Sequence, residues 1–124
     1  MNAIAKPRLL VVDDALIMRT MIKDIARRAG WEIAGEATTG AEAVARYREL
    51  KPDLVTLDIV MPEMDGVEAL RTIRGADPQA RIVMVSAVDQ RAKLAECIQL
   101  GAHDFIVKPF DREALGRFFA GLVR

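Results

Sequence analysis

LLVVDD, residues 9–14, is the stretch of sequence that decides the fold, because a continuously apolar run ends there in two carboxylates. Runs that are apolar on both faces of a strand are typical of parallel sheets covered by helices on both sides. Similar runs, rich in β-branched residues, follow at residues 32–37, 54–57, 82–85 and 105–107. Together with residues 9–12 they predict five buried strands.

Longer amphipathic segments separate these five runs. Ile17, Met21 and Ile25 repeat at every fourth residue, and Leu115 and Phe118 lie on one face of the last segment. Apolar residues at this spacing form a stripe along one side of an α-helix. We therefore expect a helix after each strand.

Residue types that start and stop helices support these helix boundaries. The expected N-terminal capping residues are Thr39 with Glu42, Asp65 with Glu68, Asp89 and Asp111. The glycines expected to follow helix ends are Gly30, Gly75 and Gly101.

Five strand-helix units in 124 residues predict one compact α/β domain. Parallel strands need right-handed crossovers, and helices must cover both faces of their sheet. We predict a flavodoxin-like, doubly wound (βα)5 sandwich with a five-stranded parallel sheet in the order 2-1-3-4-5. We expect residues 1–7 to be a short N-terminal leader and residues 8–124 to be the domain.

The composition excludes several classes of partner. Lys and Arg total 18, as do Asp and Glu, so the net charge of zero favours neither direct nucleic-acid binding nor attraction to an anionic membrane. No apolar run approaches the roughly 20 residues that cross a bilayer, so we expect no membrane insertion. Cys97 is the only cysteine, which excludes an internal disulfide and fits a cytoplasmic location.

Polar side chains gather where the predicted strands end. Asp13-Asp14 follows the first strand, Asp58 the third, Ser86 the fourth and Lys108-Pro109 the fifth. Ligands bind at this edge of such sheets, and the first and third strands are neighbours in the predicted order. Three carboxylates this close repel one another, so a cation is needed, and oxygen ligands favour Mg²⁺, with Mn²⁺ as an alternative.

These side chains predict phosphoryl chemistry. A carboxylate can attack a phosphoryl group if charge on the phosphoryl oxygens is neutralised, and Lys108 and Ser86 could neutralise it beside Asp58. Singly, each residue could be a helix cap, a turn residue or a surface amine. Their common position at four strand ends favours the joint functional interpretation.

Two other classes of protein share this architecture. An aspartate-nucleophile phosphatase normally carries a second aspartate two residues beyond the nucleophile, where this chain has Val60, and a cap domain over its substrate. A flavin-binding electron carrier needs a phosphate loop rich in Ser, Thr or Gly after the first strand, where this chain has Asp13 and Asp14. Both alternatives fit less well than a phosphoacceptor.

The motifs resemble those of response regulator receiver domains in two-component systems, and in particular their single-domain, chemotaxis-type members. The resemblance spans nearly the whole chain. It rests on LLVVDD at 9–14, LDIVMPEMDG at 57–66, VSA at 85–87, and GA at 101–102 with FIVKPF at 105–110.

This resemblance assigns expected roles to individual residues. Asp58 would be the phosphoacceptor and, with Asp14 and the backbone carbonyl of Val60, a direct ligand of Mg²⁺. Asp13 would act on the metal through water. Lys108 would contact the phosphoryl group, and Ser86 would move onto that group after transfer. Phe105 would complete the switch, and Pro109 would follow a cis peptide bond.

The same resemblance implies partners. Asp58 would take its phosphoryl group from the phosphohistidine of a sensor histidine kinase or a histidine phosphotransfer protein. The fourth helix, fifth strand and fifth helix would bind an output protein, with chemotaxis as the expected response. The domain would assist only its own phosphorylation and dephosphorylation. A phosphorelay shuttle and the receiver part of a regulator with a DNA-binding domain stay open as alternatives.

Four positions differ from the pattern of well-studied chemotaxis receivers. Phe105 replaces a common Tyr, so its ring can rotate inward but cannot donate a hydroxyl hydrogen bond. Val60 and Val88 stand where polar side chains meet the hydrolytic water or a phosphatase, so we predict that this mechanism is not used. Ser86 replaces the commoner Thr and keeps the hydroxyl.

Overall fold

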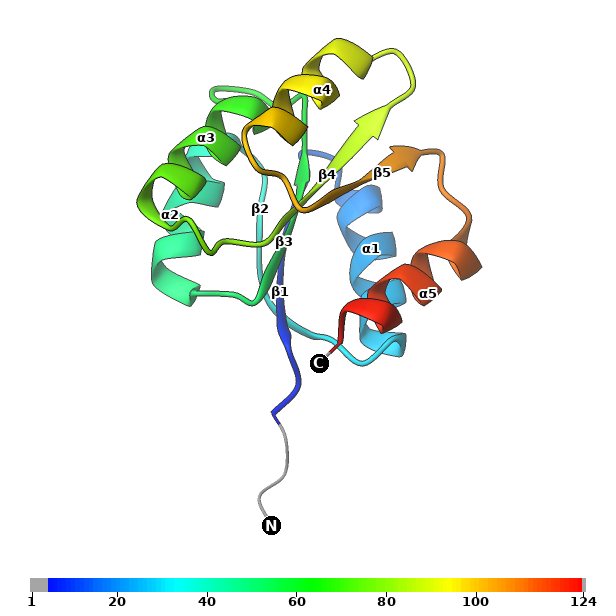
Figure 1. The fold of residues 1–124 in the computed structure, drawn as a ribbon. Helices are drawn as coiled ribbons and strands as arrows, with labels where there is room; N and C mark the ends of the chain where they lie inside the picture. The colour runs from blue at the N-terminus through cyan, green and yellow to red at the C-terminus, as the bar shows by residue number, and fades with distance from the viewer. Residues whose placement is uncertain (1–4, 124) are drawn as a thin grey trace.

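The computed structural model describes residues 5–123, which form a five-stranded parallel sheet with five helices (Figure 1). The strands are β1 (Arg8–Val12), β2 (Glu32–Ala37), β3 (Leu54–Asp58), β4 (Ile82–Ala87) and β5 (Asp104–Lys108). The helices are α1 (Leu16–Arg28), α2 (Gly40–Leu50), α3 (Gly66–Ala76), α4 (Arg91–Gln99) and α5 (Arg112–Leu122). The strand order is β2-β1-β3-β4-β5, so the predicted fold class is confirmed.

The expected leader falls partly outside the described residues. Residues 1–4 are not described, and residues 5–7 belong to no helix or strand. Within residues 5–123, no helix has the length and apolar character needed to cross a membrane.

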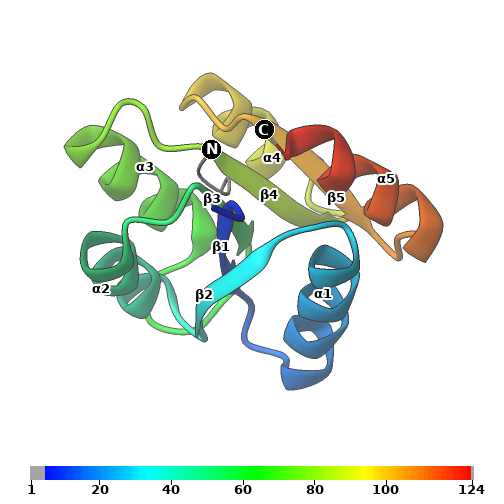
Figure 2. The same cartoon turned by 90° about the horizontal axis from the view of Figure 1, so that it is seen from below.

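The helices cover the two faces of the sheet unequally, with α1 and α5 on one face and α2, α3 and α4 on the other (Figure 2). Side chains of a strand alternate between faces, so Leu9 and Val11 pack with α1 and α5 while Leu10 and Val12 pack with the other three helices. Both clusters are almost completely buried. This double cover explains why the strands are apolar throughout.

Trp31 joins the start of β2 to the last helix. Its indole Nε1 donates a hydrogen bond to the carbonyl oxygen of Phe119 over 2.9 Å, and the two rings meet edge to face with centroids 6.4 Å apart. Both side chains are fully buried. The contact fixes α5 against the α1 side of the sheet.

Three predicted caps are confirmed. The side chains of Thr39, Asp65 and Asp111 accept hydrogen bonds from backbone N–H groups in the first turns of α2, α3 and α5. Gly30 and Gly101 follow α1 and α4 with positive φ angles of 105° and 98°, a region that favours glycine.

Two predicted helix boundaries are wrong. The N-cap of α4 is Gln90 rather than Asp89, and the Gln90 side chain accepts from the backbone N–H of Ala87 instead of capping the helix. Gly75 lies inside α3, which continues to Ala76 because glycine costs only about 1 kcal/mol in a helix.

Candidate functional site

Three carboxylates meet at the edge of the sheet where the strands end. Asp13 and Asp58 are buried, Asp14 is exposed, and one carboxylate oxygen of each lies within 4.8 Å of the others. The cluster forms because β1 and β3 are paired neighbours, which brings their carboxyl ends together. The strand order and the sequence pattern thus bring these three predicted residues to one place.

Asp13 is fixed by the backbone around it. Its N–H donates to the carbonyl of Ala37, and its carboxylate oxygen Oδ1 accepts from the N–H of Ala15 over 2.9 Å. The second bond closes a turn between β1 and α1. The other carboxylate oxygen of Asp13 therefore faces the cluster in a set orientation.

Arg19 supports the site, although sequence reasoning did not identify it. Its guanidinium donates to the carbonyl oxygen of Asp13 over 2.8 Å and forms an ion pair with Glu36. The pKa of Glu36 is lowered, mainly by the hydrogen bond from Lys23. Arg19 has no motif of its own in the sequence, because its role depends on how α1 crosses the end of β2.

Lys108 places one ammonium group between two buried carboxylates. Its Nζ lies 3.2 Å from Oδ2 of Asp13 and 3.4 Å from Oδ1 of Asp58. The following Lys108-Pro109 peptide bond is cis. Among the residues that the structure describes, Lys108 alone forms ion pairs with this cluster, and it pairs with two of the three carboxylates, so the cluster keeps an excess of negative charge.

The pKa of Asp58 is raised to about 6. Burial of the carboxylate is the largest cause, followed by repulsion from Asp13, while the Lys108 ammonium acts in the opposite direction. Burial disfavours the charged form of any carboxyl group. A second cation at the cluster would favour the ionised form of Asp58.

Ser86 is buried at the end of β4, next to the acidic cluster in the sheet. Its hydroxyl donates to the carbonyl oxygen of Ala87 over 2.9 Å. The hydroxyl would have to leave this partner to reach a group bound on Asp58.

Val60 and Val88, on the loops after β3 and β4, are 49% and 64% exposed.

Gly66 allows α3 to start directly against the backbone of Asp58. Its N–H donates to the carbonyl of Ile59 over 2.6 Å, and a Cβ atom at this position would overlap the carbonyl oxygen of Asp58. Any larger residue would displace the backbone that carries Asp58. Gly66 ends the motif at residues 57–66, but the motif alone does not reveal the close contact.

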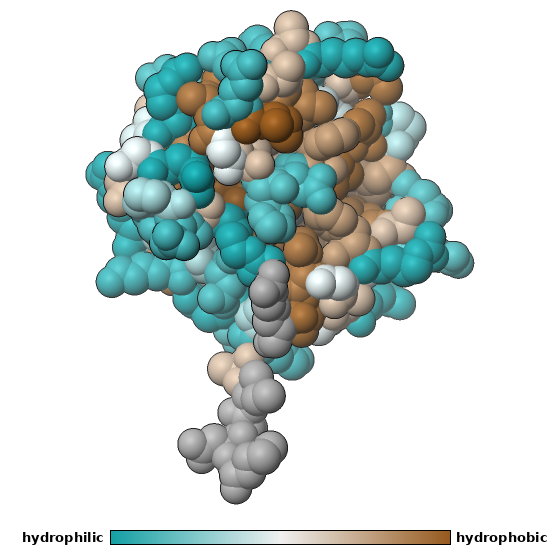
Figure 3. All heavy atoms as spheres, in the orientation of Figure 1, coloured by the Kyte–Doolittle hydropathy of each residue, from teal (hydrophilic) through white to brown (hydrophobic). Residues whose placement is uncertain are grey.

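Phe105 lies on a different surface, formed by α4, β5 and α5. Its side chain is 44% exposed, and Ile98 and Val107 are exposed nearby. Figure 3 shows apolar side chains gathered on this side of the molecule. A hollow between β5 and α5 is lined in part by Phe105, Phe110 and Phe118.

The acidic cluster has the donor set of a hard cation. It offers carboxylate oxygens from Asp13, Asp14 and Asp58, and it offers neither sulfur nor imidazole. Oxygen ligands of this kind suit Mg²⁺ or Mn²⁺ and disfavour soft metals. The residues therefore fit the divalent cation that the sequence predicts.

Comparisons with known proteins identify the family of the chain. Residues 9–118 match the family model of the response regulator receiver domain. The chain is similar to chemotaxis protein CheY of Thermotoga maritima, with 58% identity over 103 residues that cover 83% of this chain and 86% of the relative. It is 56% identical to chemotaxis protein CheY of Bacillus subtilis, over 86% of this chain and 88% of that protein.

A solved structure shows the same fold. The crystal structure of the CheX–CheY–BeF3–Mg²⁺ complex from Borrelia burgdorferi aligns with a TM-score of 0.84 and 38% identity, covering 94% of this chain and 90% of that one. The family model and these relatives cover most of the chain. The chain belongs to the response regulator receiver domain family of two-component systems.

Proposed function

We propose that Asp58 accepts a phosphoryl group and that its phosphorylation switches the surface formed by α4, β5 and α5. The observation that carries the proposal is the acidic cluster itself, in which Lys108 contacts Asp13 and Asp58 while Asp58 keeps a pKa of about 6. A buried carboxylate with excess negative charge nearby needs a metal cation and a positively charged side chain such as Lys108 to balance that charge. Phosphoryl transfer needs both.

The proposed metal ligands are Asp14, Asp58 and the backbone carbonyl of Val60, with Asp13 acting through water. When bound, Mg²⁺ would neutralise charge on the phosphoryl oxygens. The oxygen-only donor set of the three carboxylates supports this assignment.

The residues of the chain divide the transfer step among them. A carboxylate oxygen of Asp58 attacks phosphorus, and the bond from phosphorus to the donor's leaving group breaks, with the electron pair leaving on the donor. Lys108 stays near its present position and stabilises a phosphoryl oxygen. Ser86 gives up its bond to Ala87 and donates to another phosphoryl oxygen.

We propose a phosphohistidine of a sensor kinase or a histidine phosphotransfer protein as the donor. The output is a chemotaxis response through a protein that binds the α4-β5-α5 surface, in the cytoplasm. Similarity to CheY proteins supports this over a relay shuttle or a DNA-binding regulator. The chain acts on no separate substrate in this proposal and assists only its own phosphorylation and dephosphorylation.

Phosphorylation by acetyl phosphate with Mg²⁺ tests the proposal. The unaltered protein should take up one phosphoryl group per chain, and uptake should stop with EDTA or in Asp58→Asn. The control is Asp89→Asn, which removes an exposed carboxylate on the turn after β4 and should change nothing. Stoichiometric uptake by Asp58→Asn would overturn the proposal.

A further inference from the structure

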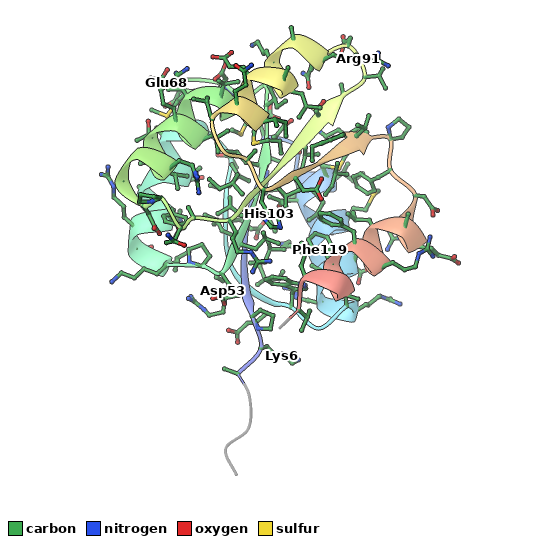
Figure 4. The ribbon with its side chains drawn as sticks, in the orientation of Figure 1. Lys6, Asp53, Glu68, Arg91, His103 and Phe119 are labelled. Carbon is green, nitrogen blue, oxygen red and sulfur yellow. The ribbon has the colours of Figure 1, made fainter. Side chains whose placement is uncertain are left out.

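Another hollow lies at the opposite end of the sheet from Asp58, where the strands begin. Its volume is about 340 Å³, and its charged lining residues are Lys6, Arg8, Asp53 and Arg81. Lys6 and Asp53 mark this end in Figure 4, below the body of the sheet. None of these residues takes part in the proposed phosphoryl transfer.

Two of the charged groups are already paired. The carboxylate of Asp53 accepts from the backbone N–H of Arg8 over 2.7 Å. The guanidinium of Arg8 donates to the carbonyl oxygen of Leu50 over 2.6 Å and lies 3.7 Å from the carboxylate of Glu32. The lining carries three basic side chains and one acidic one, so the hollow has an excess of positive charge.

Arg81 differs from Arg8 in its hydrogen bonding. Its Nε and Nη2 atoms are buried and have no hydrogen-bond partner among the described residues. Its backbone carbonyl accepts from the N–H of Val55 over 3.0 Å, which fixes the main chain at the start of β4. The side chain of Arg81 therefore has unpaired N–H donors, while its backbone is fixed. Buried donors without hydrogen-bond partners destabilise the folded state.

The position of these two nitrogen atoms on the guanidinium points to a type of ligand. Nε–H and Nη2–H lie on one edge of the planar group and point the same way. An edge of this kind matches the two oxygens of a carboxylate or phosphate and binds them with two parallel hydrogen bonds. A second cation, Lys6, lines the same hollow.

We propose that this hollow is a binding site for a small oxyanion, a carboxylate or phosphate group that Arg81 holds through Nε and Nη2 with Lys6 as a second positive charge. Both nitrogen atoms are covered now, so the Arg81 side chain turns towards the hollow that it already lines when the ligand binds. Turning breaks no hydrogen bond of Nε or Nη2, since these atoms make none with the described residues.

Nuclear magnetic resonance of the full chain tests the proposal with inorganic phosphate as the probe and sodium chloride at equal ionic strength as the reference. We use no Mg²⁺, so that the acidic cluster repels the probe. Phosphate should shift the Arg81 Nε–H signal and the backbone N–H signals of Lys6, Asp53 and Ile82 along a saturating curve. A second titration with citrate distinguishes carboxylate from phosphate as the preferred group.

Variants assign the effect to the guanidinium edge. Arg81→Gln should weaken the fitted affinity at least tenfold, and Arg81→Lys should weaken it because the ammonium cannot form the paired bonds. Arg91→Gln, at an exposed position at the start of α4, is the matched control and should bind as the unaltered protein does.

Two results would overturn the proposal without depending on how a variant folds. Shifts in the unaltered protein that grow in proportion to salt, without saturation by phosphate or citrate, mean that no site exists. Saturating shifts confined to residues near Asp58 mean that the anion binds elsewhere. Either result leaves the phosphoacceptor proposal intact, because that proposal makes no use of Arg81.

Discussion

The ionisation of Asp58 is subject to opposing effects. In the proposed transfer its carboxylate must be ionised to attack phosphorus, yet burial and the neighbouring Asp13 raise its pKa to about 6. Lys108, at 3.4 Å, offsets only part of this effect. The charge that a divalent cation would add at the cluster favours the reactive form.

This balance predicts how the stability of the metal-free protein depends on pH. The folded pKa of Asp58 lies near 6 and the unfolded value at 3.8, so the folded state binds the proton more tightly. Ionisation of Asp58 therefore destabilises the fold as pH rises from about 4 through 6, by about 3 kcal/mol at most. Asp58→Asn should lose this dependence.

The measurement is the free energy of unfolding in urea between pH 4 and pH 8, for the unaltered protein and Asp58→Asn, each with and without Mg²⁺. Mg²⁺ should stabilise the unaltered protein more at pH 8 than at pH 5. A difference between the two proteins that stays constant across this range would contradict the account.

Val60 and Val88 predict that the lifetime of the phosphoryl group depends on which side chains face it. Both valines are largely exposed, so polar replacements need no rearrangement of the core. We expect Val60→Asn and Val88→Glu to change the rate at which isolated phosphoprotein loses radiolabelled phosphate, because both positions follow strands that end at the same edge of the sheet as Asp58. Unchanged decay in both variants would refute the argument from these positions.

At the scale of elements, α3 is positioned by the absence of a side chain at its first residue. Gly66→Ala would force a methyl group against the carbonyl oxygen of Asp58. We predict a loss of about 1–3 kcal/mol in unfolding free energy, as for other overpacked sites, together with slower phosphorylation.

Gly75→Ala is the matched control in the same helix. Apart from its chain neighbours and the backbone of its own helix, no atom of the described residues lies within 4 Å of the added methyl group, and Gly75 is exposed. Alanine should stabilise α3 by about 0.5–1 kcal/mol and leave phosphorylation unchanged. Equal effects of the two substitutions would show that the close contact at Gly66 does not matter.

The sequence predicts the strands well and the helix boundaries less well. Strand positions follow from continuous apolar runs, and β2 matches its predicted range of 32–37. Helix ends depend on local competition for hydrogen bonds, which is why Gln90 precedes α4 in place of Asp89. They also depend on the modest cost of glycine in a helix, which allows α3 to run through Gly75. The residue types alone do not reveal which of two adjacent polar residues becomes the N-cap of the helix.

The acidic cluster is predictable for a similar reason. Asp13, Asp14 and Asp58 follow strands whose order is set by the fold, so the sequence is enough to bring them together. Arg19 is not predictable, because its bond to the Asp13 carbonyl depends on the crossing of α1 over the sheet. The position of the acidic cluster thus depends on the strand order, whereas the position of Arg19 depends on how α1 packs against the sheet.

At the scale of the whole molecule, the site and the proposed output surface are joined by β4 and β5. Ser86 and Lys108 lie at the ends of these strands, and Val107 pairs with Ser86 in the sheet register. Phe105 lies on the same strand as Lys108 and is exposed. In the proposed switch, movement of Ser86 onto a phosphoryl group would reach the surface formed by α4, β5 and α5 through this pair of strands.

This connection predicts partner binding that depends on the state of Asp58. Immobilised protein with BeF3⁻ and Mg²⁺, a phosphoryl mimic, should capture a flagellar motor protein that the untreated protein does not retain. Phe105→Ala should reduce this capture, whereas Ile17→Ala, at an exposed position on α1, should not. Equal capture with and without the mimic would contradict the proposed switch, and capture of a histidine phosphotransfer protein would favour a relay.

Chemical trapping of the phosphorylated residue tests the central claim most directly. The protein is phosphorylated with acetyl phosphate and Mg²⁺ and then reduced with sodium borohydride, which converts an aspartyl phosphate to homoserine. Peptide sequencing by mass spectrometry should find homoserine at position 58 and aspartate at positions 13 and 14. Stoichiometric phosphorylation with aspartate still at position 58, or with homoserine at position 13 or 14, would contradict the account.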